Sequence, residues 1–182
     1  MTLLIILAIV AALVLWFISA QRELVNQDEL CKNALSQIGV QQASRWDALK
    51  ALVELTKSYS EHEYNTLRDI IAMRKNVTGS STAADVEEQE KALSSAMRQI
   101  NIVAEQYPDL KANDTYIKTM DSVNVYENQV RMSRMVYNDT VTKYNRLIRQ
   151  IPSNFAASML HFTERQYLEV AAEKTEMPSM KI

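Results

Sequence analysis

The unbroken apolar run at residues 3–18 constrains this chain more than any other feature of its sequence. No charged side chain occurs before residue 22. A helix of about 20 such residues crosses the roughly 30 Å hydrocarbon core of a bilayer, and Trp16 and Phe17 suit the headgroup boundary at its end. The alternative is a secretory signal cleaved at Ala20, which the length of the run and the lack of a preceding Lys or Arg disfavour. We therefore predict a transmembrane anchor over residues 1–21.

The charges that flank this run predict its orientation. Arg22 and Lys32 follow it, and no Lys or Arg precedes it. The positive-inside rule then places the N-terminus outside and the C-terminal body in the cytoplasm. The single Cys31 allows no internal disulfide and is compatible with a reducing compartment. We expect a single-pass protein that contacts the lipid bilayer through residues 2–21.

Glycine and proline are scarce, which predicts an all-α body. The 182 residues include two Gly and three Pro, too few for the many turns of a β-rich fold. Roughly 160 residues follow the anchor, enough for one domain with a hydrophobic core. The formal net charge of −2 and the scattered Lys and Arg give no electrostatic case for nucleic acid. The predicted fold is an N-terminal transmembrane helix followed by an antiparallel bundle of long helices.

Apolar residues beyond the anchor recur at alternating spacings of three and four, as on the buried seam of a helix in a bundle or coiled coil. Residues 79–82, Pro108 and Pro152 interrupt this pattern and separate the helices. Thr82 or a neighbouring Ser, and later Asn113 or Asp114, are candidate N-caps. The predicted bundle covers residues 22–152, with helices at 22–76, 83–107 and 114–151.

Two parts of this layout leave alternatives open. The first helix either runs on from the anchor without a break, which we favour, or bends near residues 39–44, where Gly39 and a polar stretch occur. Residues 153–182 form a C-terminal segment, and its last ten or so residues are expected to be frayed. Its apolar side chains either fold back onto the bundle or join a neighbouring subunit. These side chains are Phe155, Met159, Leu160, Phe162, Tyr167 and Leu168.

Charged residues interrupt the apolar seams. Buried charges are costly unless they are paired, so residues of both signs on inward faces predict a structural network of ion pairs between helices. The alternative is a carboxylate cluster that binds a metal or performs acid–base chemistry. The residues of the predicted polar network are Arg45, Glu63, Glu90, Glu127 and Arg134.

The motifs of known chemistries are absent, which predicts a protein without catalytic residues, metal ligands or cofactors. A di-iron bundle requires Glu-x-x-His, whereas Tyr59 and Ser158 stand three residues before His62 and His161. We expect His62 to be a surface or interfacial imidazole. Cys31 lies on an apolar seam and is expected to pack in the core. No glycine-rich phosphate loop, zinc spacing or nucleophile elbow occurs.

Several segments together resemble the LemA family of bacterial membrane-anchored proteins. The turn at residues 104–113 reads AEQYPDLKAN, and residues 137–145 read YNDTVTKYN, followed by Pro152. In the first half, residues 34–41 read ALSQIGVQ, which resembles the family's AwsqIdVQ, and residues 52–54 read LVE, in register with the family's LVE element. The family-motif turn residues are Glu105, Tyr107, Pro108, Asp109 and Asn113, and the family-motif helix residues are Asn128, Tyr137, Asn138, Tyr144 and Asn145.

The resemblance implies a transmembrane helix with its N-terminus outside, in the bacterial inner membrane, and a cytoplasmic helical bundle. It implies no agreed enzymatic activity. The chain departs from the family's usual basic stretch at residues 43–51, which favours a continuous helix there. The motif turn also has a physical interpretation: Pro108 forces it, Asp109 and Asn113 accept from exposed backbone N–H groups, and Tyr107 closes the core.

The function predicted from these observations is that of a non-enzymatic, membrane-anchored scaffold or adaptor that self-assembles into a homo-oligomer at the inner face of the membrane. Residues 8 and 12 are Ala, and such a pair permits close packing of two spans. One alternative is a signalling element that couples the membrane helix to the bundle through its ion pairs. The other is a metal protein that uses the inward carboxylates.

Overall fold

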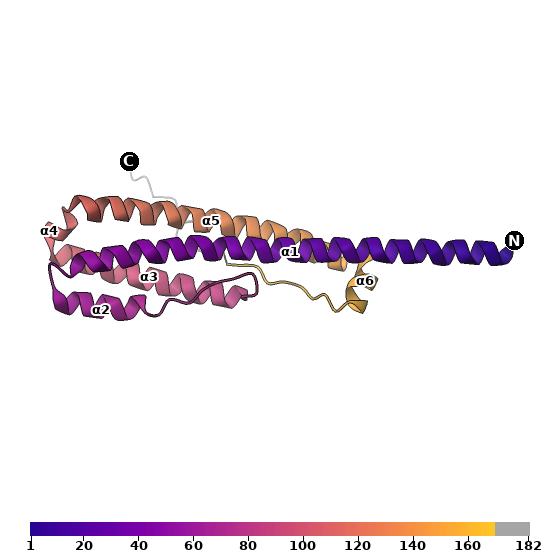
Figure 1. Cartoon of the computed structure of the whole chain (residues 1–182), viewed down its shortest axis with the longest axis horizontal. Helices are drawn as coiled ribbons and strands as arrows, with labels where there is room; N and C mark the ends of the chain where they lie inside the picture. The colour runs from indigo at the N-terminus through magenta and orange to yellow at the C-terminus, as the bar shows by residue number, and fades with distance from the viewer. Residues whose placement is uncertain (170–182) are drawn as a thin grey trace, which may run out of the picture.

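The computed structural model describes residues 1–169, in which all regular secondary structure is helical, so the prediction of an all-α fold is confirmed. The elements are α1 (Thr2–Thr56), α2 (Glu61–Ile71), α3 (Ala83–Gln106), α4 (Pro108–Lys111), α5 (Asp114–Arg149) and α6 (Ser153–Met159). The long helix α1 runs the length of the molecule, α5 lies antiparallel beside its C-terminal part, and α2, α3 and α4 cover the end far from the N-terminus (Figure 1).

Helix α1 is continuous for 55 residues, and its N-terminal part extends alone beyond the rest of the molecule (Figure 1). This part is long and apolar enough to cross a membrane, and none of its apolar window is buried inside the protein. The helix passes through residues 39–44 without the alternative bend. Gly39 has a packing role instead, because a Cβ there would lie 2.0 Å from the backbone oxygen of Val77 in the connection that crosses it.

The first helix ends earlier than predicted, because α1 stops at Thr56 and a separate helix, α2, begins at Glu61. Ser60 adopts an extended conformation, and its hydroxyl accepts a hydrogen bond from the Glu63 N–H at 3.3 Å. This N-cap starts a new helix and so replaces the predicted single helix of residues 22–76. Ser60 followed by Glu63 matches the Ser-x-x-Glu pattern of a helix start, so the sequence did contain a signal for the break.

The other boundaries follow local chemistry. Thr82 and Asp85 form a capping box at the start of α3. Pro108 ends that helix and begins the short α4, and the Asn113 side chain caps α5 by accepting from the N–H groups of Thr115 and Tyr116. These contacts satisfy backbone donors that helix ends leave unpaired.

Two hydrophobic clusters fill the bundle. The distal cluster, far from the N-terminus, includes Trp46, Leu52, Leu93 and Ile100 and is built from α1, α2, α3, α4 and the first part of α5. The proximal cluster is built from α1, α5, Val86 at the start of α3, α6 and the segment after it. Its members include Leu24, Cys31, Ile38, Val130, Tyr137, Val141, Tyr144 and Leu168.

The segment after α5 folds back onto the bundle in part. α6 buries Ala156 and Ala157 against the long helices, and residues 160–169, here named the strap, then run back along α5 (Figure 1). Leu168 is buried, and Leu160 and Phe162 pack against the proximal cluster. Phe155, Met159 and Tyr167 remain exposed. The last ten or so residues, which the sequence predicts to be frayed, lie outside the described residues 1–169.

Candidate functional site

An ion cluster lies where the two hydrophobic clusters meet. The buried guanidinium of Arg45 on α1 donates to Glu90 on α3 at 2.7 Å and to Glu127 on α5 at 3.2 Å. Gln42, one turn earlier on α1, donates at 3.3 Å to Glu90 and to the backbone oxygen of Val86. One positive side chain therefore connects three helices, which satisfies the requirement that a buried charge be paired.

The ion cluster also sets the register of the three helices. Along α3, Glu90 falls between Val86 of the proximal cluster and Leu93 of the distal one. Along α5, Glu127 falls between Val123 of the distal cluster and Val130 of the proximal one. A shift of any helix by one turn would separate these charges, so the cluster opposes sliding.

The other two residues of the predicted polar network lie elsewhere. Arg134 on α5 forms its ion pair with Glu87 on α3 at 2.5 Å and also donates to the backbone oxygen of Glu169 in the strap. Glu63 on α2 does not join Arg45, and within the described residues its side chain forms no ion pair. The seam that placed Glu63 inward does not continue through the turn between α1 and α2, so its register is lost there.

The inward face of α5 next to the strap forms a groove for extended backbone. Each of two asparagines accepts from and donates to one strap residue. Asn145 pairs with the N–H and C=O of Arg165 at 3.0 and 2.9 Å, and Asn138 pairs with the N–H and C=O of Leu168 at 2.9 Å each. The side-chain amides thereby replace the partner strand that an extended segment has in a sheet.

Two tyrosines complete this arrangement, which we name the Tyr-Asn groove and define as Tyr137, Asn138, Tyr144 and Asn145. The Tyr144 hydroxyl donates to the Thr163 oxygen at 2.9 Å, and the Tyr137 hydroxyl donates to the Gln166 oxygen at 3.1 Å. Burial raises the pKa of both phenols, so both remain protonated donors at neutral pH. The seven-residue spacing of the two Tyr-Asn pairs places both on one face of α5.

Side chains of the strap add two specific contacts. The guanidinium of Arg165 donates through Nε and Nη2 to one oxygen of Asp28 on α1, at 3.0 and 2.7 Å, and lies over the Tyr144 ring. Leu168, three residues later, is buried in the proximal cluster. Burial opposes ionisation of Asp28, but hydrogen bonds from Arg165 and Lys32 outweigh it and lower its pKa.

The family-motif turn contributes to architecture. Asn113 caps α5 and also approaches the Tyr59 hydroxyl at 3.5 Å, and that hydroxyl approaches the backbone oxygen of Asp109 at the same distance. Tyr107 is half-buried against the distal cluster. Glu105 and Asp109 are exposed, and in the part of the chain that the structure describes the Asp109 side chain accepts no hydrogen bond. Of the motif helix, Asn128 is exposed and lies outside the groove.

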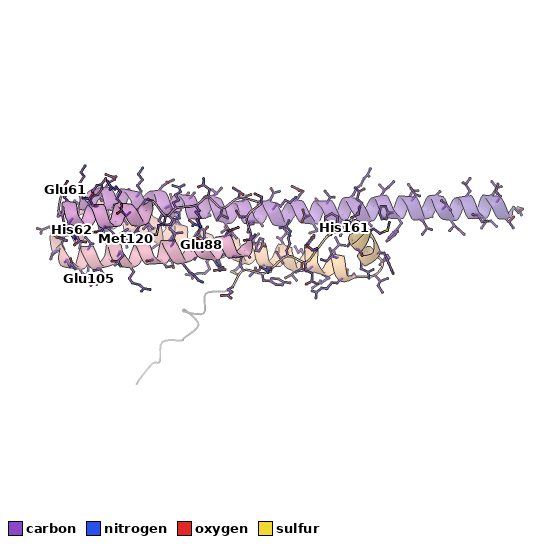
Figure 2. The ribbon with its side chains drawn as sticks, turned by 90° about the horizontal axis from the view of Figure 1, so that it is seen from below. Glu61, His62, Glu88, Glu105, Met120 and His161 are labelled. Atoms are coloured by element: carbon purple, nitrogen blue, oxygen red, sulfur yellow. The ribbon has the colours of Figure 1, made fainter. Side chains whose placement is uncertain are left out.

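The described residues contain no group of three or more His, Cys, Asp or Glu side chains that could hold a metal ion. His62 is exposed, as expected, at the distal end with Glu61 and Glu105, and His161 lies far away beside α6 (Figure 2). Cys31 is fully buried in the proximal cluster, where burial raises the pKa of its thiol to about 11. Cys31 therefore packs as a small apolar side chain, as the sequence predicts.

The sequence analysis did not predict that the strap binds to α5. It named the Tyr-Asn pairs only as family motif residues, without a partner. A signal was present, since an asparagine on an apolar seam, beside a tyrosine whose hydroxyl also needs a partner, predicts that something polar lies against that face.

These features define a helical-bundle protein carried on a helix that can span a membrane, with its bundle held in register by ion pairs. The model of the LemA family matches residues 34–182, and the chain belongs to this family. The chain is similar to a protein named Protein LemA from Metamycoplasma hominis, with 25% identity over 149 residues that cover 79% of this chain and 66% of the relative. The match thus spans just under two thirds of the relative's length.

Proposed function

We propose that this LemA-family chain is a non-enzymatic scaffold or adaptor of the bacterial inner membrane that holds copies of itself or other proteins at the cytoplasmic face. The continuity of α1 carries this proposal. One helix supplies the apolar span and then contributes Leu24, Ile38 and Leu52 to both hydrophobic clusters. No loose linker separates span from bundle, so the bundle keeps a defined angle and height above the bilayer.

A second contact with the membrane supports this placement. Ile151, Phe155 and Met159 are 79%, 62% and 71% exposed, and α6 packs on α1 in the region where Trp16 and Phe17 join the proximal cluster. Aromatic side chains favour the headgroup boundary, so α6 rests at the bilayer surface beside the span. Two contacts orient the bundle more firmly than one.

The contact of α6 with lipid is testable by fluorescence. In a Trp16→Phe background, which removes the native tryptophan of the span, a Phe155→Trp variant in vesicles of lipids with brominated acyl chains is expected to show stronger quenching than the background chain. Val125→Trp, at an exposed apolar position in the distal half of α5, serves as the matched control. Equal quenching of the two introduced tryptophans would show that α6 does not contact the bilayer.

Self-assembly is supported by apolar surface outside the span. An open groove between α1 and α5 is lined by Leu30, Met132 and Val136, which are 44%, 60% and 56% exposed. Exposed apolar surface of this kind is typical of contact regions. A second copy anchored in the same bilayer meets this groove at the same height, which favours assembly of like chains.

Native mass measurement of the full-length chain in mild detergent tests self-assembly. Dimers or larger species are expected to increase with protein concentration, and crosslinking in intact membranes is expected to yield the same species. A strict monomer at every concentration and in membranes overturns the homo-oligomeric form of the proposal. Crosslinks to a different protein alone would support the adaptor form instead.

The proposed orientation follows from Arg22, which comes directly after the span, and Lys32, which lies ten residues further along the chain. A reporter enzyme that is active only in the cytoplasm, fused after residue 182, is expected to be active. A periplasmic reporter at the same position serves as the matched control. The reverse pattern would place the bundle outside and overturn the cytoplasmic location.

A further inference from the structure

We propose that the Tyr-Asn groove is a binding site for the strap of a second copy of this chain, so that neighbouring molecules in the membrane exchange straps. This inference rests on the proposed self-assembly and names its mechanism. In the structure the groove holds the strap of its own chain. The same contacts serve a strap that arrives from a neighbour.

The groove recognises features that any copy supplies. Asn138, Asn145 and the two tyrosine hydroxyls bind strap backbone, which is independent of the side chains that the strap carries. Specificity comes from Asp28, which receives a basic side chain, and from the proximal cluster, which receives an aliphatic side chain three residues later. The ligand is therefore an extended segment with an Arg-x-x-Leu pattern, and Arg165 and Leu168 of a second copy provide it.

The start of the strap contains a hinge, His161, that favours exchange. His161 has φ 59°, in the left-handed region that a non-glycine residue adopts at a cost. It is exposed and sits just after the end of α6 (Figure 2). A strained short hinge promotes exchange of the element that follows it, because the hinge relaxes when the element leaves. All strap contacts are regained in the neighbour's groove.

Anchoring in one membrane brings the strap of one copy close to the groove of another. Copies anchored through α1 stand parallel in one bilayer, so the strap of one copy lies at the level of the groove of the next. Confinement to two dimensions raises the effective concentration of one for the other. The groove and the apolar surface lined by Met132 and Val136 lie on different flanks of α5, so strap exchange can be tested without altering that surface.

The test uses two differently tagged full-length copies in mild detergent. One has a disabled groove (N138A/N145A) and the other a disabled strap (R165E/L168D). Each variant alone is expected to assemble less than wild type by native mass measurement, because neither carries both a working groove and a working strap. Any species that remain are those held by the α1/α5 surface. The mixture is expected to form a complex with one copy of each tag. N124A/N128A, at exposed positions of α5, is the matched control and is expected to assemble as wild type does.

Three outcomes separate this inference from the proposed function. If each variant alone assembles as wild type does, strap exchange is overturned while self-assembly stands, and loss of assembly in V136E would assign it to the α1/α5 surface. If the wild-type chain never assembles, self-assembly itself fails. If a labelled peptide of residues 160–169 binds the strap-disabled variant but mixed complexes do not form, the groove binds such peptides and exchange between copies is overturned.

Variants of His161 test the inference without altering the groove or the strap residues 163–168 that bind it. Glycine adopts φ 59° readily, so H161G relieves the strain in the unexchanged chain and is expected to lower the exchanged fraction about fivefold. H161V increases the strain and is expected to raise that fraction. An exchanged fraction that is the same in wild type and both variants overturns the role of the hinge, and a change in the opposite direction contradicts the exchange.

Discussion

The distal half of the bundle packs helices around Trp46, Leu52 and Leu93, whereas the proximal half packs two long helices against a strap that has no helical structure. In the distal half, helices pack through an apolar core, and polar contacts such as those of Tyr59 with Asn113 and Asp109 lie at its edge. In the proximal half, α5 supplies polar side chains that satisfy the backbone of the strap. The difference indicates that the distal half unfolds only as a unit, while the strap can leave without loss of the helices.

The largest difference between the halves is expected from matched leucine substitutions. Leu52→Ala leaves a cavity among helices and is expected to lower the free energy of unfolding by about 2–5 kcal/mol. Leu168→Ala is expected to cost less in global stability, because the strap detaches instead. Denaturant unfolding of the full-length chain, followed by circular dichroism in mild detergent, measures both. Equal losses would contradict the comparison.

The boundary between the halves is expected to be the next most sensitive place. Arg45→Met leaves Glu90 and Glu127 near each other without their shared partner, at a cost of about 2–3 kcal/mol of unfolding free energy. The carboxylates are 25% and 32% exposed, so solvent reduces the loss. The triple variant R45M/E90L/E127L serves as the control and is expected to recover most stability by the same measurement. No loss in the single variant would show that the ion cluster does not stabilise the junction.

The strap should respond locally to loss of one amide. Asn145→Ala leaves the N–H and C=O of Arg165 without their partner, which is expected to cost about 1–2 kcal/mol in the opening of the strap. Hydrogen–deuterium exchange is expected to speed up at residues 163–169 and to stay unchanged in α3. Asn128→Ala, on the exposed face of the same helix, is the control and is expected to have no effect. Uniform acceleration over both halves would show that the strap is not a separate unit.

Acid is expected to produce the smallest effect. The pKa of Asp28 is lowered in the folded chain, so its pairing with Arg165 stabilises the strap fully at neutral pH. This contribution is lost only as the pH falls below the ordinary value for aspartate, 3.8. Pepsin cleavage near Phe162 is expected to increase in this range beyond its increase in Asp28→Asn, which lacks the titrating group. The same pH profile in both chains would show that ionisation of Asp28 does not stabilise the strap.

The sequence predicted the elements that local chemistry determines. The apolar run, Pro108 and the caps at Thr82 and Asn113 act within a few residues, so the helices that they begin or end could be located. The break at Ser60 was missed because no Gly or Pro marks it. Once the chain turned there, the phase of the seam no longer carried over, and the half-buried Glu63 does not join the ion pairs of Arg45.

The candidate site was less accessible to sequence analysis. Inward charges at Arg45, Glu90 and Glu127 were recognisable, but their pairing depends on how three helices align. The return of the segment after α5 onto the bundle was one of two sequence alternatives, but its binding to α5 was not predicted, because Asn138 and Asn145 bind its backbone and backbone leaves no pattern in the side chains of residues 160–169. Only Arg165 and Leu168 carry a side-chain signal, and their partners lie far away in sequence.

In the proposed membrane-anchored protein, the unbroken α1 couples the tilt of the span to the position of the distal end of the bundle. Residues 22–56 of this helix extend about 50 Å beyond the span. A change of about 20° in the tilt of the span, the size of typical helix tilts, would therefore move the tip sideways by roughly 17 Å. A change in bilayer thickness, or in the contacts of the span with neighbouring spans, would therefore displace the α3–α4–α5 turn that carries the family motif. A small change in the tilt of the span would produce a larger displacement of that turn.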